Sequence, residues 1–201
     1  MPDSDLRIVH AEFQKSVTAY SESAGSGIPE ICFIGRSNVG KSSAINAIVG
    51  RKIARTSSTP GATRAVNLFD IIYGDRVTKK KALFSDFPGF GYSKVSKEES
   101  RRWQHLIESY ILLNKDIRQI VWLFDIRREM DELDSMLFEW LVSNRLNFCF
   151  VLTKCDKETQ SFVSKKKKSL EVSLKGTPVF TLSSKTGKGK LQLLSFLLDL
   201  L

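Results

Sequence analysis

The chain has 201 residues, of which 42% are hydrophobic and 26% are charged, and both fractions are close to the averages of globular proteins. This length fits one domain with a substantial core, and the composition excludes a disordered chain and a membrane protein. Lys and Arg outnumber Asp and Glu by 31 to 22, which gives a net charge of +9. Such a surplus favours encounters with a polyanion such as RNA, although a solvated lysine-rich surface gives the same balance.

The N-terminus and the cysteines both favour a reducing compartment. Residues 1–5 lack the basic start and apolar run of a signal peptide, and no stretch reaches the roughly 18 apolar residues that span a bilayer. Cys32, Cys149 and Cys155 form neither a C-x-x-C pair nor a cluster with His, so neither zinc nor a disulfide framework is indicated. We therefore expect a cytoplasmic protein without stable membrane insertion.

In chain order, the first 28 residues are the hardest to interpret. Residues 12–20 could form a strand or a helix, and residues 24–29 have the composition of a loop. We expect residues 1–28 to be an N-terminal extension packed on a single domain of residues 29–201.

From residue 29 onward, short apolar runs rich in β-branched and aromatic residues alternate with segments of helical period. This alternation predicts an α/β fold with a largely parallel, buried sheet. The apolar stripes at 103, 106, 107 and 110 and at 133, 136, 137 and 140 predict helices that face the sheet, and a last helix is expected at 190–201. The strands are expected at residues 31–34, 66–72, 82–85, 120–125, 148–152 and 179–182.

A glycine-rich loop follows the first of these strands. Residues 35–42 match the pattern G-x-x-x-x-G-K-S and lead into an expected helix at 43–48. In this setting the glycines let the backbone curl, so that N–H groups and the helix N-terminus face phosphate. Lys41 is expected to reach the β- and γ-phosphates, and Ser42 to bind Mg²⁺. The residues expected to contact the nucleotide here are Gly35, Arg36, Ser37, Asn38, Val39, Gly40, Lys41, Ser42 and Ser43.

Two further segments are expected at the phosphate end of such a site. Asp86 directly follows the strand at 82–85 and can hold Mg²⁺, directly or through water, while the Gly89 N–H lies close to the γ-phosphate. Between the two motifs, the loop at 58–64 offers the Thr63 hydroxyl to complete the Mg²⁺ shell when the triphosphate is present. The expected metal ligands are Ser42, Thr63 and Asp86. The expected nucleotide contacts are Gly61, Ala62, Thr63, Arg64, Ala65, Asp86, Phe87, Pro88 and Gly89.

The segment after the strand at 148–152 selects the base. The Asp156 carboxylate can accept hydrogen bonds from the ring N–H and the exocyclic amine of guanine, and adenine offers no such pair. The stem of Lys154 is expected to pack along the base, and Thr153 to brace the neighbouring loops. The expected contacts are Thr153, Lys154, Cys155, Asp156, Leu182, Ser183, Ser184 and Lys185.

Taken together, these motifs resemble the bacterial EngB/YsxC (YihA) family of GTP-binding proteins, one of the TrmE-Era-EngA-EngB-Septin-like GTPases. The resemblance covers roughly residues 29–201 and is carried by the runs at 35–43, 55–63, 86–97 and 151–156. It implies a three-layer P-loop NTPase fold of the Ras-like type. In that fold a mostly parallel six-stranded sheet, with one antiparallel edge strand, carries helices on both faces.

The same resemblance implies a GTP/GDP switch that acts in assembly of the large ribosomal subunit and in normal cell division and septation. The expected partners are GTP, GDP and the large subunit or its rRNA, and no DNA is expected. One candidate RNA contact is the run at 165–168, with Lys154, Lys157, Lys175 and Lys185 near it in sequence. The alternative for these lysines is a solvated side of a helix.

Hydrolysis is expected to be slow and dependent on Mg²⁺. Phe90 stands where Ras-like enzymes place a glutamine that orients water, and a phenyl ring makes no hydrogen bond to water. Asn38 resembles the asparagine of potassium-dependent GTPases, so stimulation by K⁺ and by a ribosomal partner is expected. The residues expected to take part in catalysis are Lys41, Thr63, Gly89 and Asn38.

Two other functions remain open at this point. A P-loop kinase would use ATP and a phosphate acceptor, and its Asp156 would have no part in choosing the base. A GDP-locked interaction module would bind without catalysis, which the presence of Lys41, Ser42, Thr63 and Asp86 argues against.

Overall fold

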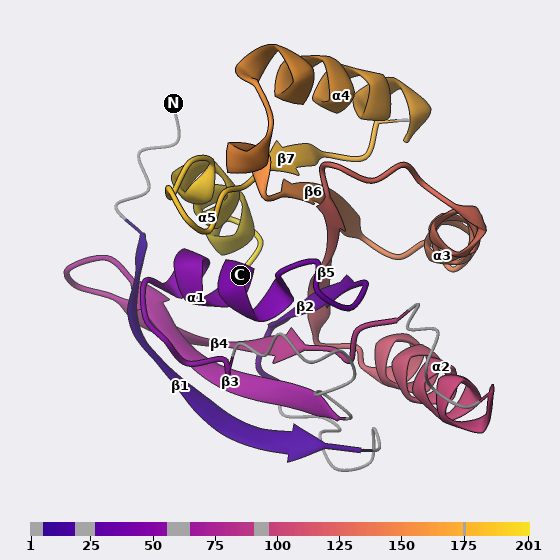
Figure 1. Ribbon diagram of the computed structural model, residues 1–201. Coiled ribbons are helices and arrows are strands. Elements are labelled where there is room, and N and C mark those ends of the chain that lie inside the picture. Colours follow the sequence, from indigo (N-terminus) through magenta and orange to yellow (C-terminus); the bar gives the residue numbers. More distant parts are fainter. Residues whose placement is uncertain (1–5, 19–26, 56–64, 91–96, 175) are drawn as a thin grey trace.

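A computed structural model of the chain describes residues 6–18, 27–55, 65–90, 97–174 and 176–201 (Figure 1). The strands are β1 (Arg7–Val17), β2 (Glu30–Gly35), β3 (Val66–Gly74), β4 (Lys79–Asp86), β5 (Ile117–Asp125), β6 (Phe148–Thr153) and β7 (Val179–Thr181). The helices are α1 (Lys41–Val49), α2 (Lys97–Leu113), α3 (Glu132–Ser143), α4 (Gln160–Ser173) and α5 (Lys190–Leu198), with a short 3₁₀ turn at Cys155–Lys157.

The strands form one sheet in the order β1-β3-β4-β2-β5-β6-β7. Strand β2 lies in the middle and pairs in parallel with both β4 and β5, whereas β3 runs antiparallel to β4. The predicted fold class, a mostly parallel α/β sheet with helices on both faces, is confirmed. All six expected strands are present, and each one except β7 ends at or just after its predicted end.

The predicted count of six strands is wrong, because the sheet formed by the described residues has seven. Strand β1 pairs antiparallel with β3, with Ala11 opposite Ile71. Strand β1 therefore forms the edge of the sheet, and β3 lies inside it, next to β4. Only Ala11 and Val17 of β1 are buried, and bulges interrupt its pairing after Ile8 and Phe13. An edge strand with so few buried positions lacks the alternation that identifies a strand in a sequence.

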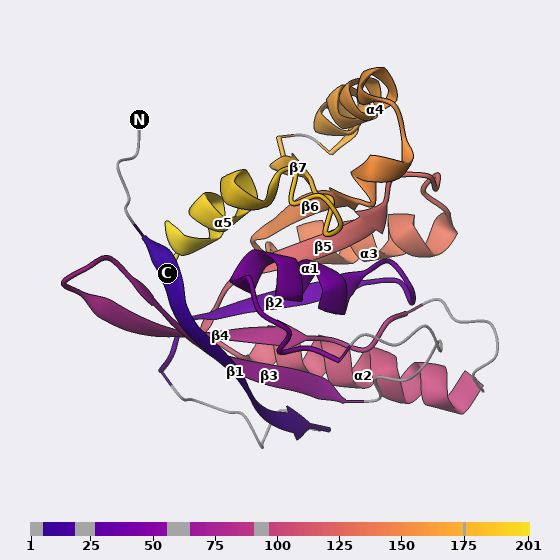
Figure 2. The ribbon, with the colours of Figure 1, turned by 60° about the vertical axis from the view of Figure 1, so that its left-hand side comes forward.

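Two apolar layers enclose the sheet. Helices α1 and α5 cover one face, where Ile45, Ile48 and Leu197 are fully buried. Helices α2, α3 and α4 cover the other face, with Tyr110 and Leu141 in its core, as the two views in Figures 1 and 2 show. Among the described residues no helix is both long and apolar enough to cross a bilayer.

Helix α3 is rotated relative to its predicted stripe. Leu133 and Met136, which were expected to face the sheet, are 48% and 57% exposed, and the fully buried positions are instead Asp134 and Leu141. These two residues are seven apart and therefore share one face of the helix. The reason for the rotation is that Asp134 turns inward to meet two arginines, which a count of apolar residues does not reveal.

Candidate nucleotide-binding site

The loop at 35–40 joins the central strand to the first helix. Its Asn38 and Gly40 have φ values of 61° and 98°, in the left-handed region, and a Cβ on Gly35 would lie 2.6 Å from the Leu123 carbonyl oxygen. Gly40 is the N-cap of α1 and, as a glycine, offers no side chain to the N–H groups of the first turn. Uncapped N–H groups at a helix start bind anions, so this loop has the geometry of a phosphate site.

Lys41 lies inside this loop and is only 9% exposed. Its Nζ donates to the carbonyl oxygens of Gly35 and Arg36, at 3.3 and 3.4 Å. Burial lowers the pKa of Lys41, and the nearby charge of Asp86 partly offsets this effect. Because carbonyl groups compensate a buried ammonium only in part, an anion entering the loop would find a strong partner here.

Strand β4 ends at Asp86, which lies beside Ser42 at the start of α1. Ser42 Oγ donates to Asp86 Oδ2 at 2.8 Å. The other oxygen, Asp86 Oδ1, is buried and has no hydrogen-bond partner among the residues that the structure describes. Burial raises the pKa of Asp86, while Lys41 and the Ser42 hydroxyl act to lower it. An unsatisfied carboxylate oxygen beside a hydroxyl and a lysine fits a hard cation such as Mg²⁺, which prefers oxygen ligands.

The segment that follows Asp86 lies directly on the loop. Ser37 N donates to the Phe90 carbonyl oxygen at 3.2 Å, and Ser37 Oγ donates to the Gly89 carbonyl oxygen at 3.2 Å. A Cβ at Gly89 would lie 2.8 Å from both the Cα and the N of Ser37. Only glycine therefore allows this approach of the two backbones.

Thr153, at the end of β6, ties this site to the next loop. Its Oγ1 donates to the carbonyl oxygens of Val39 and Phe124, at 2.8 and 3.2 Å. Lys154 follows in the left-handed region with φ 59°, and its Nζ donates to the Asn38 carbonyl oxygen at 2.6 Å and pairs with Asp125 at 3.0 Å. Thr153 thus braces its neighbours as expected, and Lys154 extends across the glycine-rich loop.

Asp156 completes the base end of the site. Ser183 Oγ donates to its Oδ1 at 2.7 Å, and this hydrogen bond lowers the pKa of Asp156 below its usual range. The carboxylate therefore stays ionised and able to accept hydrogen bonds at neutral pH. An open pocket of about 1110 Å³ extends from the end of the loop to this motif, and its lining includes Gly40, Ser43, Thr153, Asp156, Ser184 and Lys185.

Comparison with known proteins agrees with this geometry. The family model described as "50S ribosome-binding GTPase" matches residues 30–154. A probable GTP-binding protein EngB from Aquifex aeolicus is 41% identical over 172 residues, which cover 85% of this chain and 90% of the relative. Another EngB, from Syntrophus aciditrophicus, is 38% identical and covers 94% of each. The chain belongs to the EngB family of GTP-binding proteins.

Solved structures share the fold. The crystal structure of a probable GTP-binding protein EngB has a TM-score of 0.64 at 23% identity, and the match covers 85% of this chain and 97% of that one. Aquifex aeolicus Era bound to GDP and AlF₄⁻ has a TM-score of 0.71 at 18% identity, covering 87% of this chain and 57% of Era.

Several residues predicted as nucleotide contacts in this EngB-family chain have side chains in the core. The buried apolar side chains among them are those of Val39, Phe87, Pro88, Cys155 and Leu182, so any polar contact that these residues make is through the backbone. Phe87, for example, packs edge-on against Tyr110. Ala65 is half-buried directly before β3, whereas the predicted contacts Gly61, Ala62, Thr63 and Arg64 lie outside the described residues.

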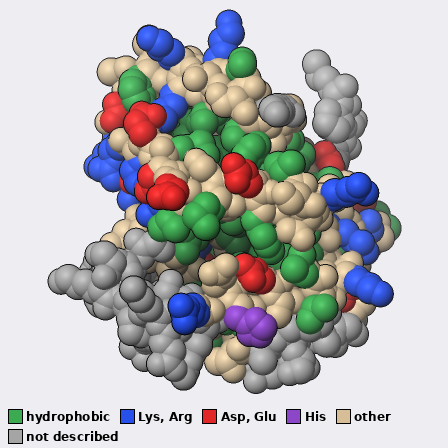
Figure 3. Space-filling view, turned by 90° about the vertical axis from the view of Figure 1, so that its right-hand side faces the viewer, with side chains coloured by type: hydrophobic (Ala, Val, Ile, Leu, Met, Phe, Trp, Pro, Cys, Tyr) green, Lys and Arg blue, Asp and Glu red, His purple; other side chains and the backbone are tan. Residues whose placement is uncertain are grey.

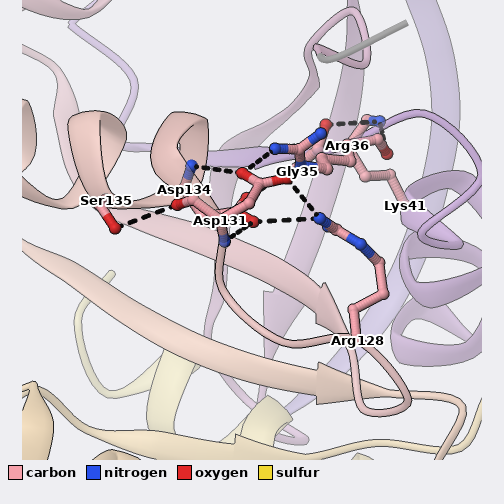
Figure 4. A network of polar contacts seen from close by, with 7 residues as sticks. All are labelled: Gly35, Arg36, Lys41, Arg128, Asp131, Asp134 and Ser135. Atoms are coloured by element: carbon pink, nitrogen blue, oxygen red, sulfur yellow. Dashed lines mark hydrogen bonds and ion pairs between the residues drawn. The ribbon is translucent and has the colours of Figure 1, made fainter.

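Sequence reasoning missed what lies behind the loop of this EngB-family protein (Figure 4). Arg36 was predicted to contact the nucleotide, but its side chain pairs with Asp131 and Asp134 at the start of α3. Asp131 and Asp134 also cap that helix reciprocally and bind Arg128. The spacing of the two acids is a recognisable helix start, but nothing in the sequence identifies their arginine partners.

Proposed function

We propose that the chain binds GTP together with Mg²⁺, hydrolyses it slowly, and alternates between GTP- and GDP-bound states. The observation that carries this proposal is the Ser42–Asp86 pair, whose second carboxylate oxygen is buried and finds no partner in the described part of the chain. The pair lies at the foot of a loop that shares one pocket with the Asp156 motif. The proposed phosphate, metal and base contacts would then follow one another in the order that a nucleoside triphosphate requires.

At the phosphate end, the uncapped first turn of α1 and the Lys41 ammonium would hold the β- and γ-phosphates. Ser42 and Asp86 would hold Mg²⁺, which neutralises charge as the terminal phosphoryl group leaves, and Thr63 is proposed to complete its shell. The Gly89 N–H would contact the γ-phosphate. Loss of that phosphate would then free the segment that now lies on Ser37.

At the base end, Asp156 would accept the two adjacent donors of guanine, already ionised and oriented by Ser183. Ser184 and Lys185, which line the same pocket, would supply backbone contacts to the guanine oxygen. This recognition of guanine sets the proposal apart from an ATP-dependent kinase.

Slow hydrolysis follows from Phe90, which cannot orient water. We propose that K⁺ compensates at Asn38, whose side chain is exposed beside the loop. Hydrolysis should then be faster in KCl than in NaCl, and Asn38→Ala should remove the difference. Equal rates in the two salts, with no effect of Asn38→Ala, would reject the K⁺ role while leaving GTP hydrolysis untouched.

The test of the main proposal is phosphate release from GTP and from ATP by the purified chain with Mg²⁺. We expect slow release from GTP alone, and Asp86→Ala should abolish it by removing a metal ligand. Glu30→Gln is the matched control, because Glu30 and Asp86 are both 2% exposed and only Asp86 lies at the loop. Release from ATP, or tight GDP binding with no turnover, would favour the kinase or the GDP-locked module.

We also propose that the chain acts in assembly of the large ribosomal subunit and thereby in cell division and septation. Support comes from the matching family, which is that of the 50S ribosome-binding GTPases, and from the net charge of +9. Era, a structural neighbour, has been solved in complex with a segment of 16S ribosomal RNA. A basic protein of this kind should bind rRNA with a strong salt dependence.

The lysines of α4 are only partly available for such a contact. Lys166 pairs with Glu129 at 2.9 Å, and Lys167 approaches Glu171 at 3.5 Å. On the face shown in Figure 3, hydrophobic and acidic side chains occupy the middle, and the Lys and Arg side chains lie towards its edges. RNA contact through α4 would therefore depend mainly on Lys165 and Lys168.

Depletion of the protein in its host, followed by ribosome gradients, tests this role. We expect precursors of the large subunit to accumulate, and restoration by wild type but not by Asp86→Ala. Normal subunits after depletion would reject the assembly role, whatever the nucleotide assays show.

A further inference from the structure

Arg36 is the second residue of the phosphate-binding loop, yet its side chain points toward α3 (Figure 4). The guanidinium donates from Nε to Asp134 at 3.0 Å and also pairs with Asp131, and the side chain is 15% exposed. The N–H donors of a guanidinium lie in one rigid plane, so two carboxylate acceptors fix its orientation closely. Arg36 is therefore held to the helix behind the loop.

Asp134 is the buried member of this cluster, with a fully buried side chain. Besides Arg36, it accepts from Arg128 at 3.2 Å and from the backbone N–H of Asp131 at 3.2 Å. A buried carboxylate with two arginine partners is stable only while they remain in place. This arrangement explains why α3 turns Asp134, rather than Met136, toward the interior.

On its other side, Arg36 contacts the segment that follows β4. Its guanidinium carbon lies 5.6 Å from the centre of the Phe90 ring, in a cation–π contact, and the two residues form an isolated parallel β-bridge. The next residue, Ser37, makes the hydrogen bonds to Gly89 and Phe90. Arg36 thus joins α3, the loop and the Gly89–Phe90 segment.

We propose that Asp134 is a positioning residue of the nucleotide site and that it acts through Arg36. By fixing the Arg36 side chain, it holds the loop backbone in its strained shape, with Asn38 in the left-handed region, and keeps Phe90 against the loop. The phosphate site is then formed before the nucleotide arrives, which reduces the ordering cost of binding. This inference rests on the proposed nucleotide binding and adds a residue about a hundred positions away in the chain.

A purely structural role for Asp134 predicts a different result. In that case its loss would destabilise α3 and the whole fold, with nucleotide affinity changing only as folding changes. If Asp134 acts through Arg36, its loss should have no further effect on affinity once Arg36 is gone, because interacting residues are not additive.

The experiment is a double-mutant cycle with Asp134→Asn, Arg36→Ala and the double variant. GDP and GTP affinities, thermal unfolding and backbone hydrogen exchange are measured for each. We expect each single variant to weaken binding on the order of tenfold, and the double variant to bind no more weakly than Arg36→Ala. Exchange at Ser37 and Phe90 should rise in all three variants, with or without nucleotide.

Two further variants complete the set. Glu30→Gln neutralises another buried carboxylate, at the start of the strand β2 that leads into the loop, and it should leave affinity and loop exchange unchanged. Asp131→Asn removes the 48%-exposed partner of Arg36 and should give a smaller rise in exchange, which supplies the measurement if Asp134→Asn fails to fold.

Unchanged loop exchange in Asp134→Asn and Asp131→Asn would overturn the inference, as would additive losses of affinity in the cycle. The two proposals can fail separately. If wild type bound neither GDP nor GTP but the variants still showed increased exchange in the loop, the positioning role would be supported and the proposed function rejected.

Discussion

The buried charged side chains at the amino and carboxyl edges of the parallel strands differ in how far their partners satisfy them. At the amino edge, Glu30 begins β2 and is enclosed by α2, where it accepts from Tyr110 at 3.0 Å and from Asn114 at 2.9 Å. Its partners are neutral, and burial raises the pKa of Glu30. At the carboxyl edge, Lys41 and Asp86 are also buried, but one Asp86 oxygen has no partner within the described ranges of the chain.

This difference separates a structural edge from a functional one. The groups around Glu30 satisfy one another, so the cluster contributes to stability and needs no ligand. At the carboxyl edge, the buried Lys41 is paired only with carbonyl groups among the described residues, one oxygen of Asp86 is unsatisfied there, and Asn38 has a positive φ. Each of these features costs stability. Such violations collect where a ligand is to be bound. Changes at the carboxyl edge should therefore alter nucleotide binding, and changes at the amino edge should alter stability.

The largest effect is expected for Asp156→Asn. The amide places an N–H donor against the guanine donors, so affinity for GDP should fall on the order of hundredfold. Xanthosine diphosphate, which carries an oxygen where guanine has its amine, should bind the variant better than GDP does. Titration with both nucleotides checks this, and retained preference for GDP would contradict the assignment of Asp156. Thermal stability should change little, because Asp156 lies at the surface.

A smaller loss is expected for Gly89→Ala. The added Cβ would lie 2.8 Å from the Ser37 backbone, so the segment must move off the loop. Hydrolysis and the preference for GTP over GDP should fall about tenfold, because the Gly89 N–H no longer reaches the γ-phosphate. GDP affinity should be nearly unchanged, since GDP has no such phosphate.

Gly176→Ala is the matched control, because nothing lies within 4 Å of a Cβ at that glycine, although its φ of +86° adds local strain. Equal effects of the two substitutions on hydrolysis would show that the close approach at Ser37 has no functional role.

The strands and the phosphate loop could be predicted from sequence because both depend on local patterns. Buried parallel strands appear as continuous apolar runs, and the glycines at 35 and 40 mark a loop that few structures other than a phosphate site need. Asp86 and Asp156 could be placed because each directly follows such a strand, and the carboxyl ends of parallel strands meet at one edge.

The remaining features depend on contacts between distant residues. Strand β1 pairs with the side of β3 that β4 leaves open. The sequence of β1 itself carries no clear period. The rotation of α3 depends on Arg36 and Arg128, which no helical pattern can relate to Asp134. A long-range ion pair has no fixed spacing, so it becomes visible only when the chain is folded.

A pH measurement sharpens the comparison at the base end. The hydrogen bond from Ser183 holds the pKa of Asp156 below 3.8, so the carboxylate stays ionised as pH falls toward that value. Ser183→Ala should raise this pKa, and GDP affinity should then begin to fall at a higher pH than in wild type. Ser184→Ala is the control, because the exposed Ser184 side chain does not bond to Asp156 among the described contacts and only the Ser184 backbone is proposed to contact guanine. Superimposable pH profiles would contradict the role of Ser183.

The smallest effect is expected at the amino edge, for Glu30→Gln. Burial raises the folded-state pKa of Glu30 above 4.5, so the folded chain keeps a proton that the unfolded chain has lost between 4.5 and the raised value. Wild-type stability therefore falls as pH rises through this window, whereas glutamine does not titrate. The unfolding temperature of wild type relative to the variant should drop with rising pH. Unfolding temperatures of wild type and variant that stay parallel across this pH range would contradict the raised pKa of Glu30. A change in GDP affinity would show that the two edges are not separate.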